Sequence, residues 1–304
     1  MEILENVSLA RHTTFGVGGN ARWFIRIASR DELPALGEFV RTQSLPFFIL
    51  GGGSNVLASD HFFEGIVIKI QNNDMMISSS GVWADAGVPL ALLTKETVQK
   101  GLSGLEWGFG IPGTVGGAVR GNAGCFGYDM SECVTHVEVF NLHTDTFEIL
   151  PSEKLIYAYR KSFFHEHPHL VIVRAYFSLV SQGIDTCTSN LKKYYEIKKQ
   201  TQPLGVHCAG SIFKNPKLDG LHADISIPVE WLTVGRIPAG FLIENVNMKG
   251  HCIGGATVSL KHANFIVQNS EGTSTHIKEL IEYIKQRVHE KFGVTLEEEI
   301  QYIT

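Results

Sequence analysis

The chain has 304 residues, which is longer than an average single domain and suits two or three lobes of ordinary domain size. Its 26 basic and 31 acidic side chains give a formal charge of -5, and this balance excludes the concentrated basic face that nucleic acids and anionic membranes require. No apolar run is long enough to cross a bilayer, and the acid-containing start lacks the apolar core of a signal peptide, so we expect a cytoplasmic protein without membrane insertion.

The first lobe is predicted to be a small α/β unit covering residues 1–70. Apolar runs of four to eight residues indicate strands, and a longer amphipathic run indicates a helix. The expected elements are strands at 21–27, 47–50 and 65–70 and a helix at 31–42 with Ser29 or Asp31 near its N-cap.

A second lobe is predicted for residues 71–182 and a third for residues 183–304, because the composition changes at Ser181-Gln182-Gly183. In the third lobe, a lysine- and tyrosine-rich helix is followed by short irregular motifs and a long helix that Gly293 ends. Expected in the second lobe are strands at 82–86, 134–141, 146–150 and 170–179 and a helix at 89–100 with proline at its first position; expected in the third are helices at 191–199, 239–245 and 274–292 and strands at 255–259 and 264–267.

Glycine is the informative residue type. The chain contains 31 glycines, ten of which fall between Gly101 and Gly127, and a separate triplet ends the strand predicted at 47–50. Consecutive glycines can turn successive N–H groups toward one point and so form a nest for a phosphate. The first such turn consists of Gly51, Gly52, Gly53, Ser54, Asn55 and Val56.

A second glycine turn follows within the dense segment. Two nests suit a pyrophosphate or a dinucleotide better than a single phosphate, although both could also be plain tight turns. No GxxxxGK[ST] motif is present, and GxGxxA at 16–21 precedes a strand instead of following one, which excludes a P-loop and a Rossmann turn. The second turn consists of Ile111, Pro112, Gly113, Thr114, Gly116, Gly117 and Ala118, followed by Gly121, Asn122 and Ala123.

Ordered motifs over nearly the whole chain resemble those of the UDP-N-acetylenolpyruvoylglucosamine reductases (MurB), and the short spacing after Arg160 resembles their type II branch. The resemblance implies an α+β fold: a two-lobed FAD-binding (PCMH-type) domain of the vanillyl-alcohol oxidase group, followed by a C-terminal α+β substrate-binding domain. The motifs are TTFGVGGNA at 13–21, ILGGGSNVL at 49–57, GLEWGFGIPGTVGGAVRGNAG at 104–124, AYRKSFF at 158–164, AGSIFKNP at 209–216, AGFLIENVNMKG at 239–250, GGATVSLKHANFIV at 254–267 and LEEEI at 296–300.

The resemblance also implies the chemistry. NADPH as co-substrate would reduce non-covalent FAD, and the hydride would pass to the enolpyruvyl group of a UDP-sugar, giving UDP-N-acetylmuramate for peptidoglycan. In matching positions, Ser211 would donate the proton, while Arg160 and Glu299 would lie against the substrate carboxylate. Lys214 and Asn215 would bind the substrate diphosphate, which fits a chain without a basic patch.

Without the resemblance, each of these residues is weak evidence for a catalytic role. Ser211 reads as a turn residue, Arg160 as a surface cation with a snorkelling stem, and Glu299 as one of three solvated acids. Two other functions therefore stay open: an FAD-dependent oxidase or dehydrogenase of the same fold, and a nucleotide-sugar binding protein without turnover. The sequence departs from the family at Gln301, where an arginine that helps to bind substrate is common.

Two features could suggest other chemistry. Cys208 has no defined base partner and is predicted to be a packing residue. The histidines of His165-Glu166-His167-Pro168-His169 are predicted to lie in a solvated loop, and we expect no metal site. The five cysteines show no paired CxxC spacing, which indicates reduced thiols, and no feature indicates an obligate protein partner.

Overall fold

The computed structural model describes residues 1–218, 228, 231 and 235–304, and these include all the predicted site residues. The chain forms two compact units, each discontinuous in sequence. The first unit consists of residues 1–7, 21–52 and 63–200, and the second of residues 8–20, 53–62 and 201–304. Both units contain helices and strands, which confirms the α+β class. The division at residues 70 and 182 stays a prediction.

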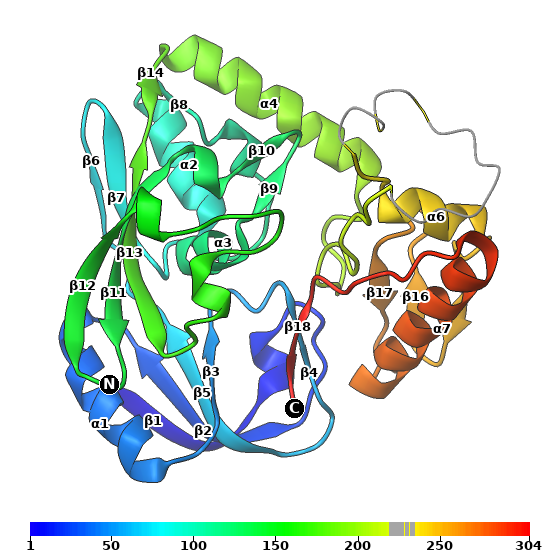
Figure 1. Cartoon of the computed structure of the whole chain (residues 1–304), viewed down its shortest axis with the longest axis horizontal. Helices are drawn as coiled ribbons and strands as arrows, with labels where there is room; N and C mark the ends of the chain where they lie inside the picture. Colours follow the sequence, from blue (N-terminus) through cyan, green and yellow to red (C-terminus); the bar gives the residue numbers. More distant parts are fainter. Residues whose placement is uncertain (219–227, 229–230, 232–234) are drawn as a thin grey trace. The chain divides into compact units, whose positions relative to one another are not determined.

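The first unit begins with a four-stranded sheet in the order β1-β2-β5-β3. The strand β5 lies between β2 and β3 and runs parallel to both, so its residues are buried on both faces. One helix, α1, packs its apolar stripe against this sheet through Leu36 and Val40 (Figure 1). The bounds are β1 (Glu2–Ser8), β2 (Asn20–Ile27), β3 (Phe47–Leu50), β5 (Phe63–Ile70) and α1 (Leu33–Gln43).

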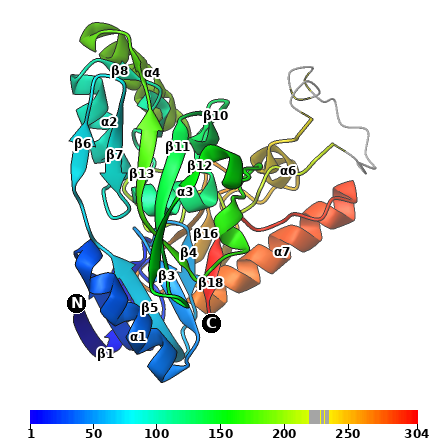
Figure 2. The ribbon, with the colours of Figure 1, turned by 60° about the vertical axis from the view of Figure 1, so that its left-hand side comes forward.

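A five-stranded antiparallel sheet, in the order β12-β11-β13-β7-β6, completes the core of this unit. The short helix α3 packs on β13 and β7, as Figures 1 and 2 show. The other elements of the unit are two short strand pairs, β8 with β14 and β9 with β10, and the helices α2 and α4. The bounds are β6 (Met75–Ile77), β7 (Gly81–Asp85), β8 (Leu102–Ser103), β9 (Gly124–Cys125), β10 (Tyr128–Asp129), β11 (Val134–Asn141), β12 (Thr146–Pro151), β13 (Leu170–Ser178), β14 (Val180–Ser181), α2 (Leu90–Gln99), α3 (Val115–Gly121) and α4 (Ile184–Thr201).

The second unit packs the helices α6 and α7 with a three-stranded sheet, β15-β16-β17, and contains a parallel pair, β18 with β4. The long helix α7 buries one face at helical spacing and ends at Gly293, whose φ of 69° suits glycine. In Figure 2 this helix is the orange-red coil. The bounds are β4 (Val56–Ala58), β15 (Cys252–Ile253), β16 (Ala256–Val258), β17 (Ile266–Gln268), β18 (Gln301–Ile303), α6 (Ala239–Asn245) and α7 (Ser274–Phe292).

Most predicted elements are confirmed to within two or three residues, and the differences have physical causes. The helix expected at 191–199 begins at Ile184, because a polar first half with weak helical propensity hides its start. Pro89 is the N-cap of α2 instead of its first residue. The sequence did not predict the helix α3, the strands β1, β4, β6 and β18, or the two-residue strands β8, β9, β10, β14 and β15. Among the described residues, no helix is both long and apolar enough to cross a membrane.

Candidate functional site

The two glycine turns touch each other within the first unit. A Cβ on Gly52 would lie 2.6 Å from Cα of Gly113, and a Cβ on Gly51 would lie 2.6 Å from Oγ1 of Thr114. Both approaches are closer than any side chain tolerates, so glycine is required at these two positions by packing. At Gly113 the φ of 122° adds a conformational reason. The two turns, one after β3 and the other leading into α3, therefore form a single structure.

The hydroxyl of Thr114 lies between these turns and marks where a ligand oxygen would fit. Its Oγ1 atom is buried without a hydrogen-bond partner in the part of the chain that the structure describes. Thr114 is the N-cap residue of α3, yet its side chain makes no cap hydrogen bond. A buried hydroxyl without a partner is costly, and a phosphate oxygen would satisfy it. The residues present therefore fit the diphosphate of FAD.

The rest of the second turn is shaped by close backbone contact. A Cβ on Gly116 would lie 2.9 Å from Cβ of Ala86, and the Gly116 N–H donates to the Ala86 carbonyl at 2.8 Å. A Cβ on Gly117 would meet only the Thr114 hydroxyl, at 3.8 Å, and one on Gly121 would meet nothing within 4 Å. Packing against other described residues therefore does not explain why Gly117 and Gly121 are glycines. The predicted contacts of Ile111, Pro112 and Ala118 with FAD stay predictions.

Asn122 ends α3 in the left-handed region, with a φ of 45°. Its side-chain amide donates at 3.1 Å to the carboxylate of Asp129 and to the Ala158 carbonyl, and its Oδ1 accepts from the Ser131 N–H. The amide therefore holds the loop together from inside. Any contact with FAD from Asn122 or Ala123 stays a prediction.

Arg160 stands in a tight turn closed by Ala158 and Lys161, whose N–H groups and carbonyls pair at 2.9 and 3.0 Å. Its φ is 55°, in the left-handed region, which costs a non-glycine residue free energy and is common at functional positions. The guanidinium donates to the Gly124 carbonyl at 2.6 Å, and more weakly to the Asn122 carbonyl at 3.4 Å. Arg160 is therefore anchored to the end of the second glycine turn.

In the second unit, Ser211 and Glu299 lie on adjacent paired segments. The Glu299 N–H donates to the Ile212 carbonyl at 2.8 Å, and the Lys214 N–H donates to the Glu297 carbonyl at the same distance. Ser211 also forms a backbone bridge with Phe265 on its other side. The structure thus brings together two of the three predicted catalytic residues, far apart in sequence, within one unit.

The first glycine turn continues into this second unit. At Gly53, with a φ of 69°, a Cβ would lie 2.0 Å from the His12 carbonyl oxygen. Asn55 then donates its Nδ2 to the Glu299 carbonyl at 3.0 Å and accepts from the Gln301 N–H at 2.9 Å. Val56 begins β4, which pairs with β18. The backbone of Glu299 is therefore held by Asn55, at the end of the turn that is predicted to bind FAD. Ser54 directly precedes Asn55, and its contact with FAD stays a prediction.

The two acids that precede Glu299 in LEEEI both have partners in the second unit. Glu297 forms an ion pair with Lys214, and Glu298 forms one with Lys285 at 3.0 Å and accepts from the Tyr302 hydroxyl. Burial, and then the Glu298 carboxylate, raises the pKa of Tyr302. Glu297 and Glu298 thus each have a cationic partner within the second unit. The catalytic role of Glu299 stays a prediction.

Lys214 and Asn215 are both engaged within the second unit. The Lys214 ammonium contacts Glu297, whose side chain is 73% exposed. Asn215 accepts the Ala239 N–H at 3.0 Å with its Oδ1, which satisfies the first turn of α6. Gln301 lies in β18, where its side chain reaches the Glu299 carbonyl at 3.5 Å. Substrate binding by Lys214 and Asn215 stays a prediction.

Three other features belong to packing. Residues 16–21 lead into β2, as expected, and a Cβ on Gly18 would lie 2.6 Å from Cβ of Ala58. Burial raises the pKa of the Cys208 thiol, opposite to what a nucleophile needs. His167 stacks on Phe163 at 3.8 Å, and His169 stacks on His143 at 4.5 Å.

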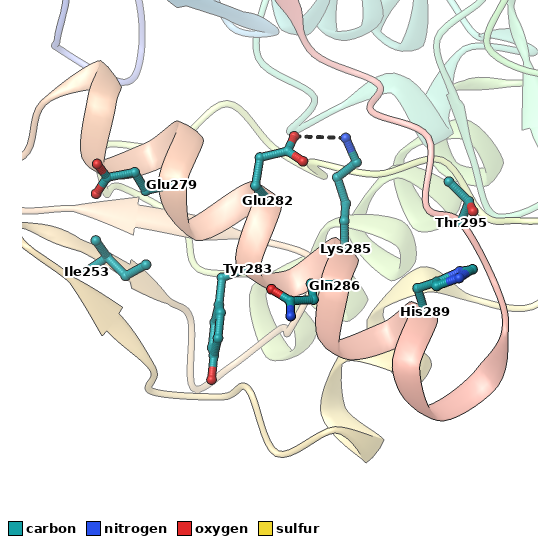
Figure 3. A pocket seen from close by; sticks show the side chains of 8 residues that line it. All are labelled: Ile253, Glu279, Glu282, Tyr283, Lys285, Gln286, His289 and Thr295. Carbon is teal, nitrogen blue, oxygen red and sulfur yellow. Dashed lines mark hydrogen bonds and ion pairs between the residues drawn. The ribbon is translucent and has the colours of Figure 1, made fainter.

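No group of three or more His, Cys, Asp or Glu among residues 1–218, 228, 231 and 235–304 could hold a metal ion. Figure 3 shows an open pocket on α7 within the second unit. None of the predicted site residues lines it. Lys285 does line it, and this lysine forms ion pairs with both Glu282, as drawn, and Glu298. The pocket is lined by Ile253, Glu279, Glu282, Tyr283, Lys285, Gln286, His289 and Thr295.

Two models of known protein families match separate parts of the chain. A family model described as an FAD binding domain matches residues 21–147. A second, the C-terminal domain of UDP-N-acetylenolpyruvoylglucosamine reductase, matches residues 202–303.

Individual relatives match over almost the whole chain. The UDP-N-acetylenolpyruvoylglucosamine reductase of Anoxybacillus flavithermus is 35% identical over 303 residues, which cover 99% of this chain and 94% of the relative. That of Caldanaerobacter subterraneus is 36% identical over 299 residues, 98% and 92% of the two chains. The crystal structure of the Thermus caldophilus enzyme superposes with a TM-score of 0.80 at 33% identity and covers 100% of both chains.

Proposed function

We propose, since the chain belongs to the family of UDP-N-acetylenolpyruvoylglucosamine reductases, that Arg160, Ser211 and Glu299 carry out the reduction of the enolpyruvyl group. The substrate is UDP-N-acetyl-3-O-(1-carboxyvinyl)-glucosamine, and the product, UDP-N-acetylmuramate, is a peptidoglycan precursor. When bound, FAD takes a hydride from NADPH and supplies it to the terminal carbon of the enolpyruvyl double bond. The chain's own residues bind, orient and protonate the substrate.

FAD would be held without a covalent bond at the two glycine turns. The N–H groups of Gly51, Gly52 and Gly113 would bind its diphosphate, and the Thr114 hydroxyl, which is buried without a partner among the described residues, would donate to one of the phosphate oxygens. Neutral donors suffice here because backbone nests bind phosphate without a cation, which agrees with the chain's acidic balance.

Ser211 gives its hydroxyl proton to the carbon next to the substrate carboxylate. The serine O–H bond breaks, a C–H bond forms at that carbon, and the serine oxygen regains a proton from water. With the hydride on the neighbouring carbon, the double bond has then gained two hydrogens. A serine hydroxyl is a weak acid, so its position relative to the carbon decides the rate.

Arg160 and Glu299 act on the substrate carboxylate. Hydride addition makes this group enolate-like, and a positioned guanidinium stabilises the extra negative charge. Because Arg160 is held in its turn by the Gly124 carbonyl, little reorganisation is needed. Glu299 lies against the same carboxylate and helps to orient it.

Lys214 and Asn215 bind the substrate diphosphate. The ammonium of Lys214 exchanges its exposed partner Glu297 for a phosphate, which costs little because an exposed ion pair contributes at most about 1 kcal/mol. We place the reaction in the cytoplasm, where NADPH is available and where the five free cysteines stay reduced.

The observation that supports these roles is the backbone pairing of the segments that contain Ser211 and Glu299, which keeps these two residues in neighbouring segments of one unit. The test follows the flavin absorption of the purified protein without oxygen. NADPH should bleach it, and the enolpyruvyl sugar should then restore it. Absence of recovery with this sugar would reject the substrate, and absence of flavin absorption would indicate a binding protein without turnover.

Ser211→Ala separates the two half-reactions. Reduction of the flavin by NADPH should stay within about twofold of wild type, because the hydroxyl takes no part in it. Reoxidation by the sugar should slow by about 10²- to 10⁴-fold, the usual contribution of a positioned acid. The control is Cys208→Ala, three residues away on the same segment, which should leave both rates unchanged. Equal slowing of both half-reactions by Ser211→Ala would contradict its role.

A further inference from the structure

The segment 211–214 is paired along both of its edges. On one edge, the Glu299 N–H donates to the Ile212 carbonyl and the Lys214 N–H donates to the Glu297 carbonyl, both at 2.8 Å. On the other edge, the backbone bridge is short: the Ile212 N–H donates to the Asn264 carbonyl at 2.8 Å, and Ser211 bridges Phe265.

On that second edge, among the described residues, the backbone of Phe213 pairs with the side chain of Asn264 instead of with a strand. Its Oδ1 accepts the Phe213 N–H at 2.9 Å, and its Nδ2 donates to the Phe213 carbonyl at 2.8 Å. With the carbonyl contact to Ile212, a single residue forms three hydrogen bonds to the segment that carries Ser211. Asn264 is only 4% exposed, so water cannot replace these bonds.

Asn264 is itself held in place. Its N–H is directed at Nδ1 of His262 at 3.2 Å, and its Cβ packs near Gly240, where an added Cβ would lie 3.6 Å away. Ile212 and Phe213 are 0% and 1% exposed, so the segment is anchored in the core by its apolar side chains as well. The hydroxyl of Ser211 therefore has little freedom to move with its backbone.

We propose that Asn264 is a positioning residue for the proton transfer, an inference which rests on the proposed role of Ser211. The asparagine sets the distance between the serine hydroxyl and the substrate carbon by fixing the backbone two residues beyond the serine. A displacement of about 1 Å costs a well-oriented reaction as much as 100-fold in rate. Hydride transfer into the flavin does not use this segment and is independent of Asn264.

The decisive variant is Asn264→Asp, since Asn264→Ala removes all side-chain bonding and risks the fold. An ionised aspartate keeps the acceptor for the Phe213 N–H but turns an oxygen toward the Phe213 carbonyl, where the wild type has a donor. A protonated aspartate restores both bonds with its O–H group. The variant's reoxidation by substrate should therefore be about 10- to 100-fold slow at pH 8 and recover as the pH falls toward 6, while its reduction by NADPH stays within about twofold of wild type.

A second readout does not depend on activity. Amide hydrogen exchange in residues 211–214 of the holoenzyme should be at least tenfold faster in Asn264→Asp than in wild type at pH 8, corrected for intrinsic rates, because repulsion between the ionised carboxylate and the Phe213 carbonyl loosens this edge of the segment. The matched control is Asn72→Ala, which removes a buried amide donor to the Val173 carbonyl in the first unit. It should lower stability without changing reoxidation or exchange at 211–214.

Several results would overturn the inference. These are wild-type reoxidation by Asn264→Asp at pH 8, equal slowing of both half-reactions, slowing that does not recover at low pH, or the same slowing in Asn72→Ala. Failure of the proposed function looks different, because Ser211→Ala would then reoxidise normally whatever Asn264→Asp does. Slow reoxidation in Ser211→Ala with a normal Asn264→Asp rejects the positioning role alone.

Discussion

Replacing Gly52 by alanine tests whether the two glycine turns form one FAD site. The added methyl carbon would lie 2.6 Å from Cα and 3.3 Å from the carbonyl carbon of Gly113. Ordinary contacts between such atoms begin near 3.4 Å. Both groups belong to the backbone, so no side-chain rotation relieves the overlap. One turn must move by about 1 Å, a shift of the size that overpacking of a tight site produces.

The size of the effect follows from that displacement. Overpacking costs about 1 to 3 kcal/mol. The apoprotein can lower this cost by letting the turns separate, whereas bound FAD requires both of them in place, so the cost falls on binding. At 1.4 kcal/mol for each factor of ten, we expect the dissociation constant of FAD to rise about 5- to 150-fold.

The assay is a fluorescence titration of the apoprotein with FAD, accompanied by urea unfolding to show that the variant is folded. Gly37→Ala serves as the control, because the atoms nearest to its Cβ in α1 would be side-chain ends of the surface pair Arg41–Asp145. The control should bind FAD as wild type does. A folded Gly52→Ala protein with a dissociation constant within twofold of wild type would refute the single-site geometry.

Two further predictions concern charge and pH. Arg160→Lys keeps the charge but loses the guanidinium group that donates to the Gly124 carbonyl, so reoxidation of the flavin by substrate should slow about 10²- to 10³-fold with FAD content unchanged. The control Lys161→Ala, in the same turn, should have no effect. A stopped-flow reoxidation rate of Arg160→Lys within threefold of wild type would contradict the role of Arg160. Burial raises the pKa of Cys133 to about 12, so the folded state binds this proton more tightly than the unfolded state and the free energy of unfolding should fall as the pH rises above about 9. The fall should reach about 1.4 kcal/mol at pH 10 and be absent in Cys133→Ala, and equal urea midpoint shifts in the two proteins between pH 8 and pH 10 would reject it.

The regular elements were predictable because their patterns are local. The helix α7 has apolar residues at helical spacing and a terminal Gly293, and both signals act within the helix itself. The helix α3 was hidden, because a segment rich in glycine has weak helical propensity. Its glycines are there for another reason: Gly116 must approach Ala86 closely, and tertiary contact overrides local preference.

The site was predictable only in part, because its residues meet through pairing between distant segments. The strands β4 and β18 have three residues each and carry no clear period, yet their parallel register puts Gln301 opposite Val56. Asn264 lies within the motif GGATVSLKHANFIV, and its one local signal is that it is a polar residue at the start of the strand predicted at 264–267. The sequence alone gives no means to see that its amide serves Phe213.

The boundary between the two units falls inside the first glycine turn, and this has a consequence for the reaction. Gly51 and Gly52 contact the second glycine turn in the first unit, while Asn55 holds the Glu299 carbonyl in the second. The turn that is predicted to bind the FAD diphosphate is thus continuous in sequence with Asn55, which holds the Glu299 carbonyl. We therefore expect that binding of FAD at this turn also restricts the backbone of Asn55 and, through it, the position of Glu299.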